Sequence, residues 1–383
     1  MKINSHDDFK RVIYTFQGGG ALGAYQAGVF QGLTESGHYE PNWIIGTSIG
    51  AFNAGIIAGN PPKKRVEKLH QFWNSITSDL IPCINNLPMM RKFHNFLSAE
   101  QSIYLGINDF FYPNINNPFF AYNSSPDNIS FYVTEPLKKL LAQFIDFDYI
   151  NHGKIRLTLG VVEVQHGKAC FFDNQDQTIT IDHILASGAL PPGFPSVKIE
   201  GKYYWDGGIF NNSPFTALLN EPVNKKTICF VNNVFDSFGL LPKSLDDVLK
   251  RHKDIIYSSH FRSNIDIYKI VHGLRYILSH LSQHIPDKLK KNPELQDLMH
   301  LQEKIAPIHF VRFLYQSPEY ELSSKDYDFS RISMEEKLTN GYDDAKKALK
   351  EVPWLTEDNK ETGIHVHEFY RDLEKLKTIH KDY

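Results

Sequence analysis

One serine of this chain lies between two glycines, in the segment Gly46-Thr47-Ser48-Ile49-Gly50. The order Gly-x-Ser-x-Gly is typical of a nucleophile elbow, a sharp turn from a strand into a helix around which side chains must be absent. An apolar run at 43–45 precedes the serine and small residues follow it, as a strand and a closely packed helix require. At the N-terminus of that helix, amide groups and the helix dipole favour the charge that develops when a hydroxyl attacks an ester. The motif therefore predicts Ser48 as the nucleophile of an acyl hydrolase, with a chance match among 24 glycines as the alternative.

A second glycine-rich segment, 18–23, follows the apolar run at 12–16. Its spacing, Gly18-x-Gly20-x-x-Gly23, suits an anion-binding loop but also the fingerprint that holds a dinucleotide pyrophosphate. A dinucleotide fold needs an acidic residue for the ribose after the next strand, and this chain has the serine motif there. The position of the serine motif therefore favours a hydrolase over a nucleotide-binding protein. The alternative that the glycines form a turn without any ligand remains.

The elbow needs a base, and the best candidate is Asp206, which Gly207 and Gly208 follow. In α/β-hydrolases several strands precede the serine, and an acid and a histidine follow it, whereas here one clear strand precedes Ser48. A carboxylate becomes an adequate base where a dry site raises its pKa. The alternative for Asp206 is a turn aspartate that binds its own backbone.

A histidine triad is the main mechanistic competitor, because the chain has 17 histidines. The candidates are His166, His183, His309 and His365. None of them lies in a strong motif, and a lone histidine is more often a surface or core residue than a base.

Four segments, in this order, resemble the patatin-like phospholipase family. They are the glycine run at 18–23, the elbow at 46–50, the alanine-rich and proline-rich stretch at 186–195, and the Asp-Gly-Gly at 206–208, within a region from Val12 to Phe235. The resemblance implies a three-layer α/β/α sandwich and a catalytic dyad of Ser48 and Asp206 without histidine. It also implies that the backbone amides of Gly18, Gly19 and Gly20 form the oxyanion hole.

The activity that the resemblance implies is that of a lipid acyl hydrolase of phospholipase A or lysophospholipase type, acting on a phospholipid or another fatty-acyl ester. Thioesterase or general carboxylesterase activity is the alternative within the same chemistry, and a catalytically silent lipid-binding protein is the alternative outside it. One position departs from the family, because many members carry Arg or Lys where this chain has Leu22. A cationic contribution to the oxyanion loop is therefore absent at that position.

The length of 383 residues suits one large domain plus an extension, or two domains. With the resemblance, it implies an acyl hydrolase domain at 9–235 and a mostly helical extension at 236–383 that packs on or near it. Apolar runs predict strands at 227–231 and 308–313, and helical spacing predicts helices at 267–281, 295–305 and 334–349. The segment 316–331 reads as a loop and resembles the C-terminal extension of one bacterial subgroup of patatin-like proteins. We expect the charged end from Thr356 onward to be loosely ordered.

A net charge of −3 argues against nucleic acid as a partner, and no cofactor or metal is implied. The three cysteines Cys83, Cys170 and Cys229 are too few and too far apart for a disulfide framework or a zinc knuckle. Without a transmembrane-length segment or a secretory signal, we expect a cytoplasmic protein, with signal-independent export left open. The sequence does not define the oligomeric state.

Two segments are candidates for contact with a membrane surface. The aromatic segment 104–132, with Phe110, Phe111 and 119–120, reads either as an acyl-binding cap or as a loop whose rings fill the core. The cluster Lys288, Lys290 and Lys291 reads either as a headgroup contact or as a solvated face.

Overall fold

The glycine run and the elbow follow two neighbouring parallel strands of the computed structural model, β1 (Arg11–Phe16) and β2 (Trp43–Thr47). The structure describes residues 9–78, 87–115, 124–212, 214–221, 224–258, 261–282, 284–286, 289, 292, 306–356 and 363–369. Both strands are runs of buried apolar residues, as expected for parallel strands that helices cover on both faces.

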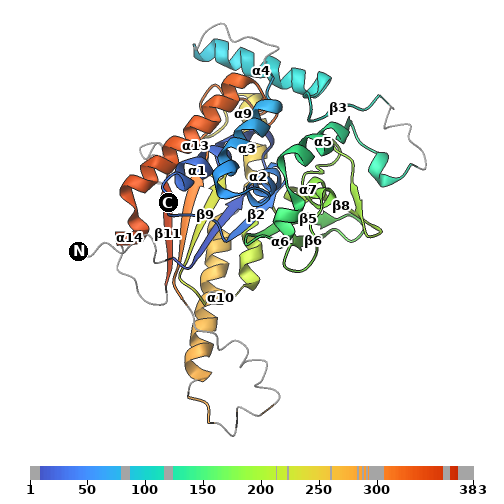
Figure 1. Ribbon diagram of the computed structural model, residues 1–383. Coiled ribbons are helices and arrows are strands. Elements are labelled where there is room, and N and C mark those ends of the chain that lie inside the picture. Colours follow the sequence, from blue (N-terminus) through green and yellow to red (C-terminus); the bar gives the residue numbers. More distant parts are fainter. Residues whose placement is uncertain are drawn as a thin grey trace.

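Within the described residues, nine strands form one sheet in the order β11-β10-β9-β1-β2-β5-β8-β7, with β6 paired to β5 (Figure 1). The other strands are β5 (Arg156–Glu163), β6 (Lys168–Asp173), β7 (Val197–Ile199), β8 (Lys202–Asp206), β9 (Thr227–Asn233), β10 (Ile308–Leu314) and β11 (Ile364–Phe369). The strands from β11 to β5 are parallel, whereas β6 and β8 run antiparallel to β5, and β7 runs antiparallel to β8.

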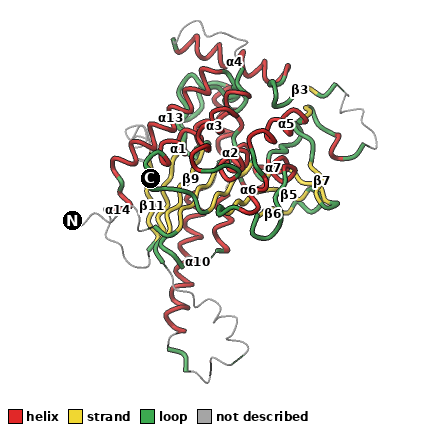
Figure 2. Tube along the Cα trace, viewed as in Figure 1, coloured by secondary structure: helices red, strands yellow, loops and turns green. Residues whose placement is uncertain are grey.

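Side chains alternate between the two faces of the sheet, which separates the core into two layers. Tyr14 and Phe16 of β1 join one hydrophobic cluster, and Ile13 joins the other. The first cluster includes α1 (Gly23–Thr34), α2 (Ile49–Ala58) and α3 (Pro62–Ser75), and the second includes α10 (Phe261–Ser282). Figure 2 shows these helices on either side of the strands, so the predicted α/β/α sandwich is confirmed.

The C-terminal region contributes strands as well as helices. Strand β10 pairs with β9, and β11 pairs with β10, so both belong to the sheet that carries the elbow. Helix α13 (Arg331–Glu351) packs closely on α1, since a Cβ atom at Gly28 would lie 2.0 Å from the Leu338 carbonyl oxygen, and one at Gly341 would lie 2.0 Å from that of Tyr25. The division into a domain at 9–235 and an extension at 236–383 stays a prediction.

Most predicted elements of this region agree with the structure. The strands at 227–231 and 308–313 and the helices at 267–281 and 334–349 are confirmed. The loop predicted at 316–331 is confirmed up to residue 330, because Arg331 begins α13. The expectation of loose order from Thr356 onward is wrong for β11, because pairing with β10 and stacking of Phe369 on Phe313 hold this strand. The helix predicted at 295–305, the three lysines at 288–291, Cys83 and the rings at 119–120 lie outside the described residues.

Shorter elements surround the sheet. They are η2 (Gly20–Leu22), α4 (Pro88–Leu105), β3 (Tyr112–Pro113), η4 (Pro126–Asn128), β4 (Tyr132–Val133), α5 (Glu135–Phe144), α6 (Phe147–His152), α7 (Ile181–Ser187), α8 (Gly208–Asn211), η5 (Pro214–Asn220), α9 (Leu245–Tyr257) and α14 (Pro353–Thr356). In the described part of the chain, none of the helices combines the length and apolar character needed to span a bilayer.

Candidate active site

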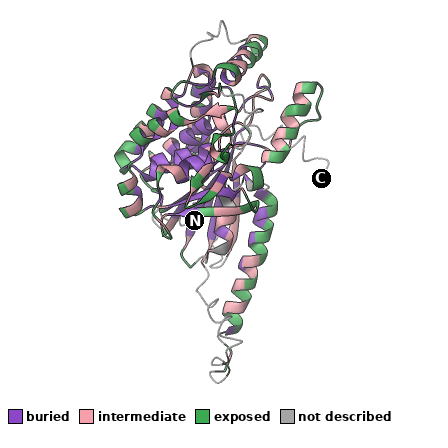
Figure 3. Ribbon diagram, turned by 90° about the vertical axis from the view of Figure 1, so that its right-hand side faces the viewer, coloured by how far each residue is buried: buried purple, intermediate pink, exposed green. Residues whose placement is uncertain are grey.

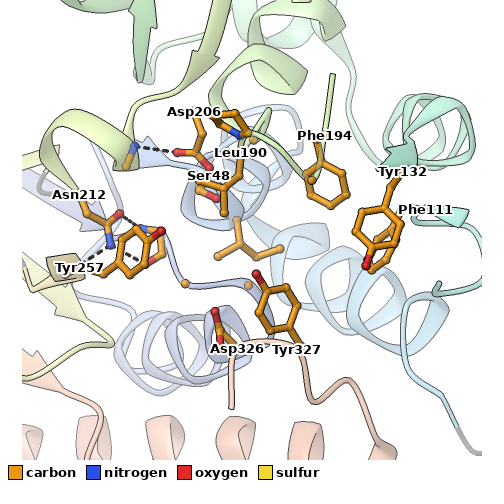
Figure 4. Close-up of a pocket in the computed structure, with 18 of the residues that line it drawn as sticks. Ser48, Phe111, Tyr132, Leu190, Phe194, Asp206, Asn212, Tyr257, Asp326 and Tyr327 are labelled. Atoms are coloured by element: carbon orange, nitrogen blue, oxygen red, sulfur yellow. Dashed lines mark hydrogen bonds between the residues drawn. The ribbon is translucent and has the colours of Figure 1, made fainter. Parts of the chain in front are cut away.

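Two strands that run in opposite directions end at the same point of the sheet. Strand β2 ends at Thr47, which pairs with Gly160 of β5. Strand β5 continues beyond that level, and β8 runs back along it until Asp206 pairs with Val161, one residue further on. The residue after β2 is Ser48, so the sheet register itself brings the predicted nucleophile and the predicted base together (Figure 4).

The elbow around Ser48 has the backbone geometry that its sequence predicts. Ser48 has φ 57° and ψ −129°, a conformation that L-residues rarely adopt, and its N–H donates to the Ser187 carbonyl oxygen at 3.0 Å. A Cβ atom at Gly46 would lie 2.5 Å from the Gly50 carbonyl oxygen, and one at Gly50 would lie 2.3 Å from that of Phe16. Both flanking glycines are therefore required by space.

The carboxyl group of Asp206 is buried, with 1% of the residue exposed. Burial raises the pKa of Asp206 to about 7, against smaller lowering effects of hydrogen bonds from the Ser48 hydroxyl and the Gly208 N–H. The Gly208 N–H donates to Asp206 Oδ1 at 2.7 Å. A Cβ atom at Gly207 would lie 2.7 Å from the Gly160 backbone. The backbone directly after Asp206 therefore packs against β5 so closely that only glycine fits.

The glycine loop passes directly over Ser48. A Cβ atom at Gly18 would lie 2.8 Å from the Ser48 Cβ atom, and Gly20 has a positive φ of 54°. The Gly18 N–H donates to Asn212 Oδ1 at 3.0 Å, so this predicted oxyanion donor already has an acceptor. Within the described residues, the amides of Gly19 and Gly20 have no such acceptor, which leaves these two as the available donors of the loop.

Asn212 is a site residue that the sequence alone did not identify. Its side-chain amide nitrogen donates to the carbonyl oxygens of Gly18 and Tyr257, each at 3.0 Å, while its oxygen accepts from the Gly18 N–H. Asn212 thus ties the glycine loop to the C-terminal end of α9 (Figure 4). A signal existed, because Asn212 comes six residues after Asp206, at the end of the short helix that the two glycines begin.

The last glycine of the run has a packing role. A Cβ atom at Gly23 would lie 2.8 Å from Ile49 Cγ1 and 2.9 Å from Trp73 Cζ2, so Gly23 lets α1 lie close to α2 and α3.

Leu22, at the position where many family members carry a cation, is fully buried in the core. Among the described residues that line the pocket, the one cation is Lys253, whose Nζ atom lies 2.7 Å from a carboxylate oxygen of Asp326.

A pocket of about 460 Å³ opens above Ser48. Its walls are mostly apolar and include Ile103, Phe110, Phe111, Leu190, Phe194 and Phe329. This volume lies within the range of small-molecule sites. Phe110 and Phe111 are buried and also line the pocket, so these two rings contribute both to the core and to the cavity wall.

The histidines considered for a triad lie elsewhere. His183 caps α7 by accepting from the Thr180 N–H at 3.0 Å, and His166 lies 2.8 Å from Glu163. His309 and His365 stack on each other in β10 and β11. Among the described residues that line the pocket there is no histidine. Nor do the described residues include a cluster of His, Cys, Asp or Glu that could hold a metal ion.

Comparison with known proteins places these features in context. A family model described as patatin-like phospholipase matches residues 14–219, and a second, described as patatin phospholipase, matches residues 255–361. No curated protein matches the chain.

Similar solved structures include two bacterial proteins. VipD from Legionella pneumophila is 14% identical, with a TM-score of 0.38, and the match covers 89% of this chain and 67% of that one. The type III effector protein ExoU is 10% identical, with a TM-score of 0.33, and the match covers 92% of this chain and 58% of that one. A complex of ExoU with SpcU from Pseudomonas aeruginosa matches at 16% identity with a TM-score of 0.28, covering 75% of this chain and 58% of that one. The chain thus spans less than two thirds of the length of ExoU.

Proposed function

The chain belongs to the patatin-like phospholipase family, and from this premise we propose that it hydrolyses fatty-acyl ester bonds of lipids as a phospholipase A or lysophospholipase. The observation that carries the proposal is the pairing of Ser48, in a strained elbow, with the buried Asp206 at one end of an apolar pocket. We assign Ser48 as the nucleophile and Asp206 as the general base.

The reaction proceeds in two acyl transfers. The Ser48 oxygen attacks the ester carbonyl while its proton moves to the Asp206 carboxylate, and a tetrahedral intermediate forms. Its oxyanion accepts hydrogen bonds from the amides of Gly19 and Gly20, close to the N-terminus of α2. The intermediate collapses, and the alcohol leaves with the proton held by Asp206. Water then attacks the acyl-enzyme by the same route and releases the fatty acid.

The environment of Asp206 suits this role. A base transfers protons best when its pKa lies near the working pH, and burial raises the pKa of Asp206 to about 7. An exposed aspartate, with its ordinary pKa, would be a much weaker base toward a serine hydroxyl. The raised pKa therefore supports a mechanism in which one carboxylate takes the place of a histidine.

The apolar walls of the pocket support a lipid as substrate. Aromatic and aliphatic side chains offer no partners for a polar acyl group but bury an alkyl chain favourably. A thioester or a simple carboxylic ester would react by the same steps, so thioesterase and general carboxylesterase activities are the alternatives. A cytoplasmic location stays a prediction.

A fluorophosphonate probe tests the assignment of the nucleophile, because it reacts covalently with an activated serine. We expect labelling of the wild-type protein and none of Ser48→Ala, together with fatty-acid release by the wild type alone. A wild-type protein that neither reacts with the probe nor releases fatty acid would instead be a catalytically silent lipid-binding protein. Release of fatty acid by Ser48→Ala at the wild-type rate would refute the mechanism.

A further inference from the structure

Helix α9 turns its charged side toward the protein. The Lys250 ammonium donates to the Glu321 carbonyl oxygen at 2.9 Å, and Lys253 and Asp254 form ion pairs with Asp326 and Lys325, each at 2.7 Å. These contacts attach the helix to the loop that precedes α13. The inner face of α9 is therefore held by charges and hydrogen bonds, and none of its residues is fully buried.

The side of α9 that faces solvent is mostly apolar, with the exposed His252 between its apolar residues. Its exposed side chains follow helical spacing and include Leu245, Val248, Leu249, Ile255 and Ile256. Leu245 is 75% exposed and Leu249 is 52% exposed. A surface helix normally has the reverse arrangement, with its apolar stripe toward the core. We call these five residues the outer stripe of α9.

Helix α4 is reversed in the same way. Its buried side chains are mostly polar and include Arg91, His94, Asn95, Ser98 and Ser102. Its exposed side chains include five large apolar ones, Met89, Phe93, Phe96, Tyr104 and Leu105, beside Pro88 and Lys92. Met89 is 82% exposed and Phe93 is 57% exposed, in contrast to the buried Arg91, which pairs with Glu336 at 2.7 Å. We call the five exposed residues the outer stripe of α4.

The two helices lie at one end of the molecule and share the pocket. Figure 1 shows α4 and α9 at the top of the view, and Figure 3, turned by 90°, shows exposed residues on the helices at that end. Ile103 of α4 and Tyr257 of α9 both line the pocket above Ser48.

We propose that the outer stripes of α4 and α9 form one lipid-docking surface, which holds the enzyme on a membrane with the pocket facing the acyl chains. The inference rests on the proposed function, because an acyl ester in a bilayer must pass into the apolar pocket without crossing water. Both stripes flank that path, and exposed apolar area of this kind has a free-energy cost in water that contact with lipid removes. Lys92, in the first half of α4, and Lys243, two residues before α9 begins, are both exposed and would meet the phosphate of a lipid headgroup at this surface.

An exposed apolar stripe on α10 supplies the control. Ile270 is 64% exposed and Ile277 is 52% exposed, values similar to those of the proposed surface. Figure 1 shows α10 extending from the opposite end of the molecule, so one flat bilayer does not meet both ends. The same chemical change at α10 should therefore leave docking intact.

The test is sedimentation with phosphatidylcholine vesicles, using the full chain with Ser48→Ala so that lipid is not consumed. Three double variants are compared: Phe93→Ser with Phe96→Ser on α4, Leu245→Ser with Leu249→Ser on α9, and Ile270→Ser with Ile277→Ser on α10. Loss of two large apolar side chains from the bilayer should weaken vesicle partitioning by at least about tenfold for the α4 and α9 variants. The α10 variant should bind as the parent does.

Turnover of a short-chain ester below its micellar concentration, measured with Ser48 restored, separates docking from chemistry. We expect the α4 and α9 variants to keep this turnover and to lose turnover of vesicle lipid. Equal vesicle binding by all three variants, equal loss in all three, or burial of the stripes in a dimer of the chain in solution would each overturn the docking surface. An inactive wild type that still shows the predicted pattern of vesicle binding would refute the proposed function and leave the docking surface standing.

Discussion

Replacing Asp206 with Asn should abolish turnover and, at the same time, make the protein more stable above neutral pH. Asn has nearly the same shape as Asp, and its oxygen can still accept the Gly208 N–H, so packing changes little. Asn cannot take a proton from Ser48, and loss of a general base typically costs about 10²- to 10⁴-fold in rate. The gain in stability has a separate origin: the neutral Asn side chain avoids the desolvation cost of the charged Asp206 carboxylate in the buried site.

The size of that gain follows from the shift of the pKa from 3.8 to about 7. The folded protein holds the proton of Asp206 more tightly than the unfolded chain, so wild-type stability falls as the pH rises between these two values. Each unit of pKa corresponds to about 1.4 kcal/mol, so Asp206→Asn should be more stable by about 4 kcal/mol above pH ~7. The difference should shrink to about 2 kcal/mol near pH ~5.

Equilibrium unfolding in urea, at about pH 5 and about pH 8, measures this difference for the two proteins under the same conditions. Ser48→Ala is the control, because it should also be inactive. Its difference in unfolding free energy from wild type should not grow by about 2 kcal/mol over this pH interval, since it keeps the buried carboxyl group. If the stability difference between Asp206→Asn and wild type were the same at both pH values, Asp206 would not be a buried carboxyl with a raised pKa. The basis for its role as the base would then be lost.

Four further outcomes are expected. The kcat/KM of the wild type should rise with pH around a midpoint of about 7, because the base acts in its ionised form, and a profile flat from about pH 5 to 8 would contradict this. Ser48→Gly should be more stable than Ser48→Ala by about 1 kcal/mol in urea unfolding, since glycine tolerates the positive φ; equal stabilities would mean that the elbow is unstrained. Asn212→Ala should lower kcat by at least about tenfold with a smaller change in KM, because it removes two hydrogen bonds to Gly18 and one to Tyr257 that hold the glycine loop in place. An unchanged kcat would show that Asn212 does not position this loop. Gly341→Ala should cost at least about 2 kcal/mol in thermal or urea unfolding, because its Cβ atom would lie 2.0 Å from the Tyr25 carbonyl oxygen, and a neutral effect would show that α1 and α13 can separate.

The central part of the site could be predicted because its geometry is encoded locally. A strained serine needs glycines within two residues on either side, and a chain that turns away at once from a buried carboxylate needs glycines directly after it. Such requirements appear in the sequence as short motifs. The strands before the glycine run and before the elbow were recognisable too, because each is a continuous apolar run.

The remaining features depend on contacts between distant parts of the chain. Asn212 reaches Gly18 across 194 residues, and only the fold reveals that this contact occupies one predicted oxyanion donor. Strand β11 alternates histidines with apolar residues inside a charged tail, so its membership of the sheet depends on the neighbour β10. The helices α4 and α9 were not predicted from the sequence, and periodicity alone would not tell which side of each helix faces the protein.

The loop before α13 is synthesised late, and it completes the pocket above the reactive groups. Its Asp326 accepts the Ala21 N–H through its carbonyl oxygen at 2.9 Å, and Tyr327 and Phe329 line the pocket. When the ribosome has translated the chain through β9, the nucleophile, the base and both donor glycines have already been synthesised. Tyr327 and Phe329, which complete a pocket wall that also includes residues from earlier in the chain, are synthesised only after β10. The nascent protein thus carries its reactive groups for some time before it has a complete compartment in which to use them.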